Sequence, residues 1–214
     1  MIYELKKYIK NEEFDYLLLL SFLKNYKYPR DKIKNLLQKQ KIIRIKKGLY
    51  IFNAQYRDRP FSREILANMI YGPSYISSEY ALSYYGLIPE RVEVLTSVTL
   101  QYKKVFQTPV GTFVYYTIPK KVYAYGIDWI EIEKNRFVLM ADMEKALLDK
   151  IYLDRGIYFH SLKDVELYLF ENLRVDENLF FSLKRKKLDL YIQKYQSKKL
   201  ELIFKFFLSK KDGK

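Results

Sequence analysis

The sequence predicts an α+β fold, and three observations predict it. Residues 1–60 combine short amphipathic helical patterns with a basic hairpin pattern. Residues 92–140 carry runs of β-branched and aromatic side chains that are broken by glycine and proline. The rest of the chain returns to a helical spacing of apolar residues. We therefore expect a domain at 1–54, a linker at 55–60, and a mixed α/β domain at 61–214 with a small sheet and a helical C-terminal portion.

Composition limits the class of protein. The chain has 214 residues, 49% of them hydrophobic and 17% aromatic, which is ample for a packed core. It has no cysteine, which excludes disulfides, thiolate zinc sites and thiol nucleophiles. The apolar run Tyr16–Leu20 is far shorter than the roughly 20 residues that span a bilayer, and the start of the chain lacks a signal-peptide pattern. We expect a cytoplasmic protein with no membrane partner.

Positive charge is concentrated at the two ends of the chain. Residues 1–60 hold 15 Lys/Arg and 6 Asp/Glu, residues 61–160 hold 11 of each, and residues 161–214 hold 13 and 8, within a total net charge of +14. This uneven distribution favours a polyanionic partner for the ends, and nucleic acid fits better than a membrane because no lipidation signal or basic amphipathic helix is evident. A basic surface that serves only solubility is the alternative.

The first sixty residues predict three helices and a hairpin. Apolar spacing predicts helices at Ile2–Lys10 and Phe14–Asn25, with Leu17, Leu20 and either Phe22 or Leu23 facing inward. Pro29 suits a first helical position, so the next helix is expected at Pro29–Gln40. Its buried stripe would be Ile33, Leu36 and Leu37.

The opposite side of the Pro29–Gln40 helix carries polar residues suited to DNA. Asn35 and Gln38 have amide groups that can bond adenine in the major groove, and Lys34 and Lys39 beside them can reach phosphates. The Asp31 carboxylate would either accept a hydrogen bond from cytosine or stabilise the helix N-terminus by its negative charge. This arrangement is typical of a recognition helix.

Two β-rich runs follow, joined at Lys46-Lys47-Gly48, where glycine can adopt a positive φ. Together with the preceding helices they predict a winged helix-turn-helix domain, with Arg44, Lys46 and Lys47 of the wing lying along the DNA backbone. The alternative is a small protein-docking domain whose charges are simply solvated.

The second part of the chain begins with two predicted helices, Phe61–Tyr71 and a segment capped by Ser77 or Ser78 and closed by Gly86. Predicted strands and later helices follow, at Val92–Leu100, Val110–Ile118, Ile127–Glu133, Phe137–Met140, Ala141–Leu153, Ser161–Asn172, Asp176–Lys186 and Leu188–Leu208. The amphipathic helix Ala141–Leu153 is expected to cover the sheet.

Four short motifs, in this order, resemble one known family. They are Lys47-Gly48-Leu49-Tyr50, Tyr75-x-Ser77-x-x-x-Ala81-Leu82-x-Tyr84-x-Gly86-Leu87-Ile88, Thr96-Ser97-Val98-Thr99 and Glu144-Lys145-Ala146-Leu147-Leu148-Asp149. Across about residues 14–155 the chain resembles the AbiEi antitoxins of abortive-infection, type IV toxin–antitoxin systems.

The resemblance implies a winged-helix domain that binds inverted repeats of double-stranded DNA in its own promoter and represses the operon. It also implies a C-terminal domain that neutralises a nucleotidyltransferase-like toxin without a stable complex. Inverted repeats imply two protomers on DNA, with a monomer or a dimer in solution. The alternatives are an antitoxin that sequesters its toxin directly and a plain transcriptional regulator without a toxin.

The residues offer little to an enzyme, so we expect no catalytic residue, metal or cofactor. The single histidine, His160, is expected in a loop or cap, and the carboxylates of Asp142, Glu144, Asp149 and Asp154 scatter around a helix. An enzyme acting on nucleic acid is the remote alternative.

A second basic run stands apart from the predicted winged helix. Lys184, Arg185, Lys186 and Lys187 are consecutive, and they could contact phosphates or a ligand of the second domain. The simpler interpretation is a solvated C-terminal helix end, where lysines are favourable.

Overall fold

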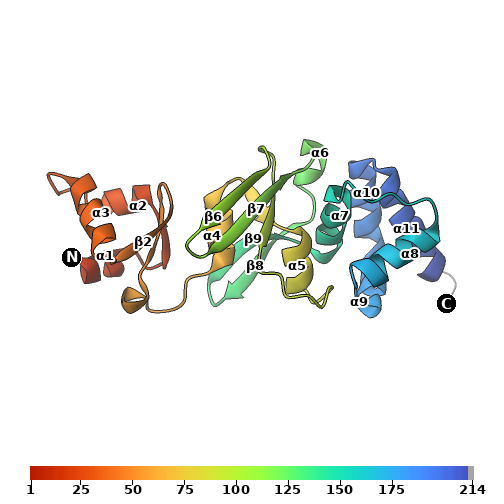
Figure 1. Ribbon diagram of the computed structural model, residues 1–214, viewed down its shortest axis with the longest axis horizontal. Coiled ribbons are helices and arrows are strands. Elements are labelled where there is room, and N and C mark those ends of the chain that lie inside the picture. The colour runs from red at the N-terminus through yellow and green to blue at the C-terminus, as the bar shows by residue number, and fades with distance from the viewer. Residues whose placement is uncertain (212–214) are drawn as a thin grey trace.

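The computed structural model describes residues 1–211 and has the mixed α+β architecture that the sequence predicts. Figure 1 shows an elongated arrangement, with an N-terminal unit at one end, a sheet in the middle and a group of helices at the other end. Buried apolar side chains form two clusters, a smaller one within residues 2–52 and a larger one that extends from Ile45 to Phe207.

The N-terminal unit contains helices and a small antiparallel sheet. Its elements are α1 (Ile2–Tyr8), β1 (Glu13–Asp15), α2 (Tyr16–Phe22), α3 (Pro29–Gln38), β2 (Ile42–Lys46) and β3 (Leu49–Phe52), followed by a 3-10 turn at Ala54–Tyr56. The sheet order is β1-β3-β2, and Phe14 pairs with Tyr50 while Ile43 pairs with Ile51.

The predicted helix Phe14–Asn25 is wrong at its start. Glu13–Asp15 pair with β3 as strand β1, and α2 begins only at Tyr16 because the Asp15 carboxylate accepts a hydrogen bond from the amide N–H of Leu18 at 2.8 Å. The expected burial of Leu17 is also wrong. Leu17 is 72% exposed, whereas Leu19 and Leu23 are buried. Leu17, Leu18, Leu19 and Leu20 are all apolar, so their spacing alone does not select the buried face, and packing against the N-terminal unit decides it.

The second unit is built on a six-stranded mixed sheet in the order β6-β7-β5-β4-β9-β8. Its strands are β4 (Ser74–Ile76), β5 (Leu95–Thr99), β6 (Lys104–Thr108), β7 (Gly111–Thr117), β8 (Ile127–Glu133) and β9 (Arg136–Ala141). The helices that accompany them are α4 (Arg63–Ile70), α5 (Ser78–Tyr84), α6 (Lys120–Tyr123) and α7 (Met143–Leu153). The sequence analysis missed β4 and β6.

Helices cover both faces of this sheet. The registers place Tyr75, Val98 and Tyr116 on one face, and neighbouring residues point to the other. On the first face Tyr75 donates a hydrogen bond to Asp149 of α7, and on the second Tyr115 donates one to the carbonyl of Ala67 in α4. The sheet is therefore the middle layer of the unit.

The C-terminal helices pack against α7 rather than directly on the sheet (Figure 1). They are α8 (Leu162–Leu167), a π-helical turn at Tyr168–Asn172, α9 (Glu177–Ser182), α10 (Arg185–Tyr195) and α11 (Lys198–Lys211). The single helix expected at Leu188–Leu208 is wrong, because Gln196 adopts a left-handed conformation with φ 53° and separates α10 from α11. Most of α7 is buried between the sheet and these helices.

The two units are joined by a buried ion pair. Arg136 of β9 donates from Nη2 to both oxygens of Glu13 in β1, at 2.5 and 2.6 Å, and both side chains are buried. The hairpin of β2 and β3 is also shared: Ile42 and Phe52 belong to the smaller apolar cluster, whereas Ile45 belongs to the larger one. The position of the hairpin is therefore fixed from both sides.

Across residues 1–211, the structure contains no helix that is both long and apolar enough to cross a membrane.

Replacing Arg136 by methionine should destabilise the protein by about 3–5 kcal/mol, because it leaves the Glu13 carboxylate buried without its cation. Urea unfolding measures this free energy. Arg155→Met, which removes an exposed arginine, is the control and should cost well under about 1 kcal/mol. An equal, small cost for both variants would contradict the role of the pair.

Candidate nucleic-acid interface

Helix α3 is held by one apolar side and leaves the other side free. Pro29 occupies the first turn of α3, where its missing N–H is no loss. The negative charge of Asp31 stabilises the same N-terminal end of the helix. Ile33 and Leu36 are buried against the N-terminal unit. Their spacing of three residues places both on one face, so the opposite face is open to a ligand.

The structure brings four of the predicted contact residues together on this open face. Lys34, Asn35, Gln38 and Lys39 are all exposed. Within residues 1–211, none of their side chains has a hydrogen bond or ion pair with another residue. Their donors and acceptors are therefore available to a partner.

The β2–β3 hairpin lies beside α3 and has a tight turn. Gly48 adopts φ +86°, a conformation that side chains disfavour, and its carbonyl accepts a hydrogen bond from the Tyr16 N–H at 2.8 Å. The turn is thus tied to the start of α2. Arg44 and Lys47 are exposed on the hairpin.

Lys46 differs from the other predicted contact residues. It is partly buried, its ammonium donates to the carbonyl of Ile70 in the second unit, and it lies 5.9 Å from the ring centre of Phe106. Burial and the neighbouring Lys104 lower its pKa below the usual value. A phosphate contact by Lys46 stays a prediction, and it would have to coexist with these structural contacts.

Two hollows flank the start of α3, and they identify residues that the sequence analysis missed. One of about 510 Å³ lies between α3 and the hairpin turn, with Arg30 on one side and Lys47 on the other. The second, of about 480 Å³, is lined by Lys27, Tyr28 and again Arg30. Arg30 was overlooked because it lies toward the side of α3 that faces the hairpin, away from the centre of the polar face. Its spacing of four residues before Lys34 was the available signal.

The second basic run lies elsewhere. Lys184 to Lys187 precede and begin α10, which Figure 1 places at the far end of the molecule from α3. Lys184, Arg185 and Lys186 are exposed, whereas Lys187 forms an ion pair with Asp142 at 2.7 Å. The interpretation as a C-terminal helix end is wrong, because α9 stops at Ser182 and the run stands at a helix N-terminus, where cations are disfavoured.

The carboxylates of α7 serve packing. Asp149, fully buried, accepts from Ser77 at 2.6 Å, from Lys145 at 2.7 Å and from Tyr75 at 3.0 Å, and Tyr195 donates to it as well. Burial lowers the pKa of Lys145, an effect that the Asp149 carboxylate opposes. Asp142 caps α7 through the N–H of Lys145. Within residues 1–211, no group of three or more potential metal-ligating side chains converges.

His160 lies in an exposed bend before α8. Its backbone N–H donates to Asp164 at 2.7 Å, and the next residue, Ser161, forms the capping box of α8 with the same aspartate. The structure therefore places His160 at a helix start, as the sequence predicts.

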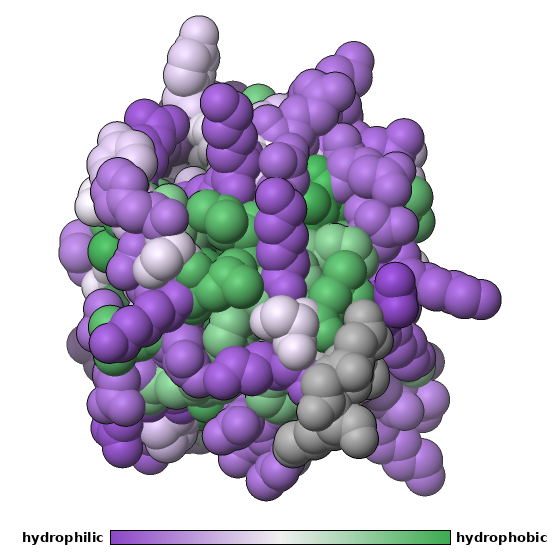
Figure 2. Space-filling model, turned by 90° about the vertical axis from the view of Figure 1, so that its right-hand side faces the viewer, coloured by the Kyte–Doolittle hydropathy of each residue, from purple (hydrophilic) through white to green (hydrophobic). Residues whose placement is uncertain are grey.

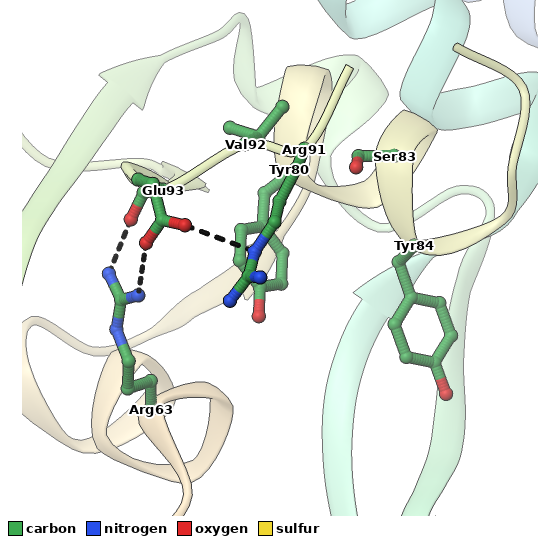
Figure 3. A pocket seen from close by; sticks show the side chains of 7 residues that line it. All are labelled: Arg63, Tyr80, Ser83, Tyr84, Arg91, Val92 and Glu93. Atoms are coloured by element: carbon green, nitrogen blue, oxygen red, sulfur yellow. Dashed lines mark hydrogen bonds and ion pairs between the residues drawn. The ribbon is translucent and has the colours of Figure 1, made fainter. Parts of the chain in front are cut away.

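A further small hollow of about 180 Å³ lies at the surface of α4 and α5 (Figure 3). Two arginines converge there on one carboxylate: Arg63 approaches Glu93 at 3.7 Å and Arg91 approaches it at 3.1 Å. Tyr80, on the wall of the hollow, donates a hydrogen bond to Glu64. Burial of the Tyr80 hydroxyl, and to a smaller extent this hydrogen bond, raises the pKa of Tyr80. The charges in the hollow are largely paired with one another.

Comparisons with known proteins leave the family open. No protein-family model matches the chain, and no curated protein matches it. Among solved structures, the chain is similar to a "putative nucleotidyltransferase from H. pylori", with 15% identity and a TM-score of 0.32 over 71% of this chain and 93% of that one. A likeness at this TM-score supports no inference about fold or function.

Substituting Gly48 by alanine should destabilise the protein by about 1 kcal/mol or more, because a Cβ is strained at φ +86°. Thermal unfolding measures the change. Gly156→Ala is a matched control, since Gly156 has no atom within 4 Å of the added Cβ and its φ is not positive. Equal stability of the two variants would show that the turn tolerates a side chain.

Proposed function

We propose that this protein is a sequence-specific, double-stranded DNA-binding transcriptional autorepressor, and that its N-terminal unit is a winged helix-turn-helix domain. The order of helix, strand, two helices and a β hairpin supports this assignment. In it α3 is the recognition helix and the β2–β3 hairpin is the wing.

The observation that carries the proposal is the open face of α3 beside the hairpin turn. Asn35 and Gln38 have no side-chain partner within residues 1–211. A side-chain amide of this kind can form two hydrogen bonds with one adenine in the major groove. Arg30 and Lys47 face one another across the hollow between helix and hairpin, where a phosphate would meet two cations. Lys34, Lys39 and Arg44 extend the positive charge along the same unit.

A second role as the antitoxin of a type IV, AbiEi-like operon is proposed from the motifs. Tyr75 and Ser77 of the second motif bond Asp149 of the fourth. Thr96 of the third motif donates to the carbonyl of Ser77 at 2.6 Å. Motifs that are distant in the sequence thus share one hydrogen-bond network in this protein.

Direct protein binding is the second candidate. Figure 2 shows apolar side chains at the centre of the C-terminal helical end, surrounded by hydrophilic ones. A groove of about 290 Å³ between α10 and α11 is lined by Ile192 and Phe204 as well as charged residues. Such a surface could hold a toxin directly, as a conventional antitoxin does.

The DNA proposal is tested by a gel-shift titration of the protein with its own upstream region, against unrelated duplex, at two salt concentrations. Specific binding that survives the competitor and weakens steeply with salt is expected. Loss to the competitor at every salt concentration would reject sequence-specific binding and favour the protein-binding candidate.

Two substitutions separate base-specific recognition from electrostatic binding to the DNA backbone. Asn35→Ala should reduce the preference for the operator over unrelated duplex, by about 1–3 kcal/mol if the amide bonds a base. Lys47→Ala should weaken binding to both duplexes alike and lower the salt slope by about one. Competition titrations distinguish the two effects, and identical profiles for the two variants would contradict the assigned roles.

The antitoxin role is tested in cells that carry the adjacent reading frame. If that frame encodes a nucleotidyltransferase-like toxin, its expression should arrest growth, and co-expression of this protein should relieve the arrest. Affinity purification of this protein should then recover no stable complex with the toxin. Recovery of the neighbouring protein with this chain would instead favour direct sequestration.

A further inference from the structure

The junction between the two units brings two lysines together. Lys46 extends from β2 and Lys104 begins β6 in the second unit, a strand that Figure 1 shows on the side toward the hairpin. Both ammonium groups lie over the ring of Phe106, at 5.9 Å for Lys46 and 5.1 Å for Lys104. Two residues far apart in the sequence thus place like charges on one aromatic side chain.

Among the described residues, this lysine pair has no carboxylate partner. Within residues 1–211, neither Lys46 nor Lys104 forms an ion pair with a carboxylate. Lys104 lies 5.5 Å from the ring centre of Tyr71 as well, so its closest described partners are aromatic. Holding two cations near one another without a counterion is unfavourable unless an anion binds there.

The pair is continuous with the surface proposed to bind DNA. Lys47, the residue after Lys46, faces the hollow between α3 and the hairpin. Lys103, the residue before Lys104, is exposed but lies over the ring of Tyr116 at 5.0 Å, on the opposite face of the sheet from Phe106 and Tyr115. Cations therefore follow one another from Arg30 through the hairpin turn to Lys104 at the start of β6.

We propose that Lys46 and Lys104 form a phosphate-binding site at the junction, so that the sheet unit contacts the DNA backbone beside the segment read by α3. This inference rests on the proposed DNA-binding function and extends it to a second part of the chain. The ligand is the phosphodiester backbone of duplex DNA, and the site reads no bases.

The rigid junction between the two units favours phosphate binding by Lys46 and Lys104. The buried Glu13–Arg136 pair and the contact of Lys46 with the Ile70 carbonyl fix the hairpin relative to the sheet. The cations of the two units are therefore held in one arrangement before DNA arrives, which reduces the ordering cost of binding.

The test measures the affinity of the full-length protein for its upstream duplex and for unrelated duplex over a series of salt concentrations. Lys104→Gln should weaken binding to both duplexes about 3- to 10-fold, and should lower the slope of log affinity against log salt by about one. Lys104→Arg keeps the cation and should retain wild-type binding. Lys163→Gln, which removes an exposed lysine of α8 at the far end of the molecule, should change neither quantity.

The outcomes separate this inference from the function on which it rests. Wild-type affinity and slope for Lys104→Gln, combined with weakened binding by Lys47→Ala, would overturn the junction site and leave the winged-helix proposal standing. An equal loss for Lys104→Gln and Lys163→Gln would reduce the effect to net charge and overturn the site as well. Absence of any duplex binding by the wild-type protein would overturn both proposals. Thermal unfolding of each variant establishes that it is folded.

Discussion

The second unit depends on the hydrogen bonds that the buried Asp149 carboxylate accepts. It is fully buried and accepts hydrogen bonds from Tyr75 and Ser77, around the end of β4, from Lys145 on its own helix and from Tyr195 on α10. A buried charge is tolerated only when its partners are complete, so these elements must assemble together. The sheet, α7 and the C-terminal helices are thereby joined through one residue.

A second buried charge connects this assembly to the N-terminal unit. Arg136 emerges from β9 and meets Glu13 of β1, while the hairpin contributes Ile45 to the larger apolar cluster. The consequence for function is geometric. The open face of α3 is presented at a fixed orientation to the sheet. The hairpin belongs to both units, which explains why its two adjacent lysines differ: Lys47 faces the hollow beside α3, whereas Lys46 is held by the sheet unit.

The sequence predicted long elements with a clear period and missed short ones. β8 was predicted with the observed bounds, Ile127–Glu133, because isoleucine and tryptophan side chains interspersed with carboxylates run over seven positions without glycine or proline. β4 has three residues, and β6 has only the adjacent pair Val105 and Phe106 between polar residues, so neither alternates over the four or more positions that predict a strand. They are strands because neighbouring strands offer hydrogen-bond partners, which is a non-local effect. Likewise, Arg30 belongs to the candidate site because the hairpin lies beside it, a placement that tertiary packing decides.

By itself, the sequence determined the mixed α+β class, the helix beginning at Pro29, its exposed polar face and the hairpin turn at Gly48, because periodicity, proline and glycine act over a few residues. Tertiary structure alone decided that Leu17 is exposed, that Lys46 contacts the second unit, and that Lys46 and Lys104 share one ring. These outcomes depend on which surfaces meet after the chain has folded. Local patterns carry no information on that, since residues 46 and 104 are brought together only by packing between the units.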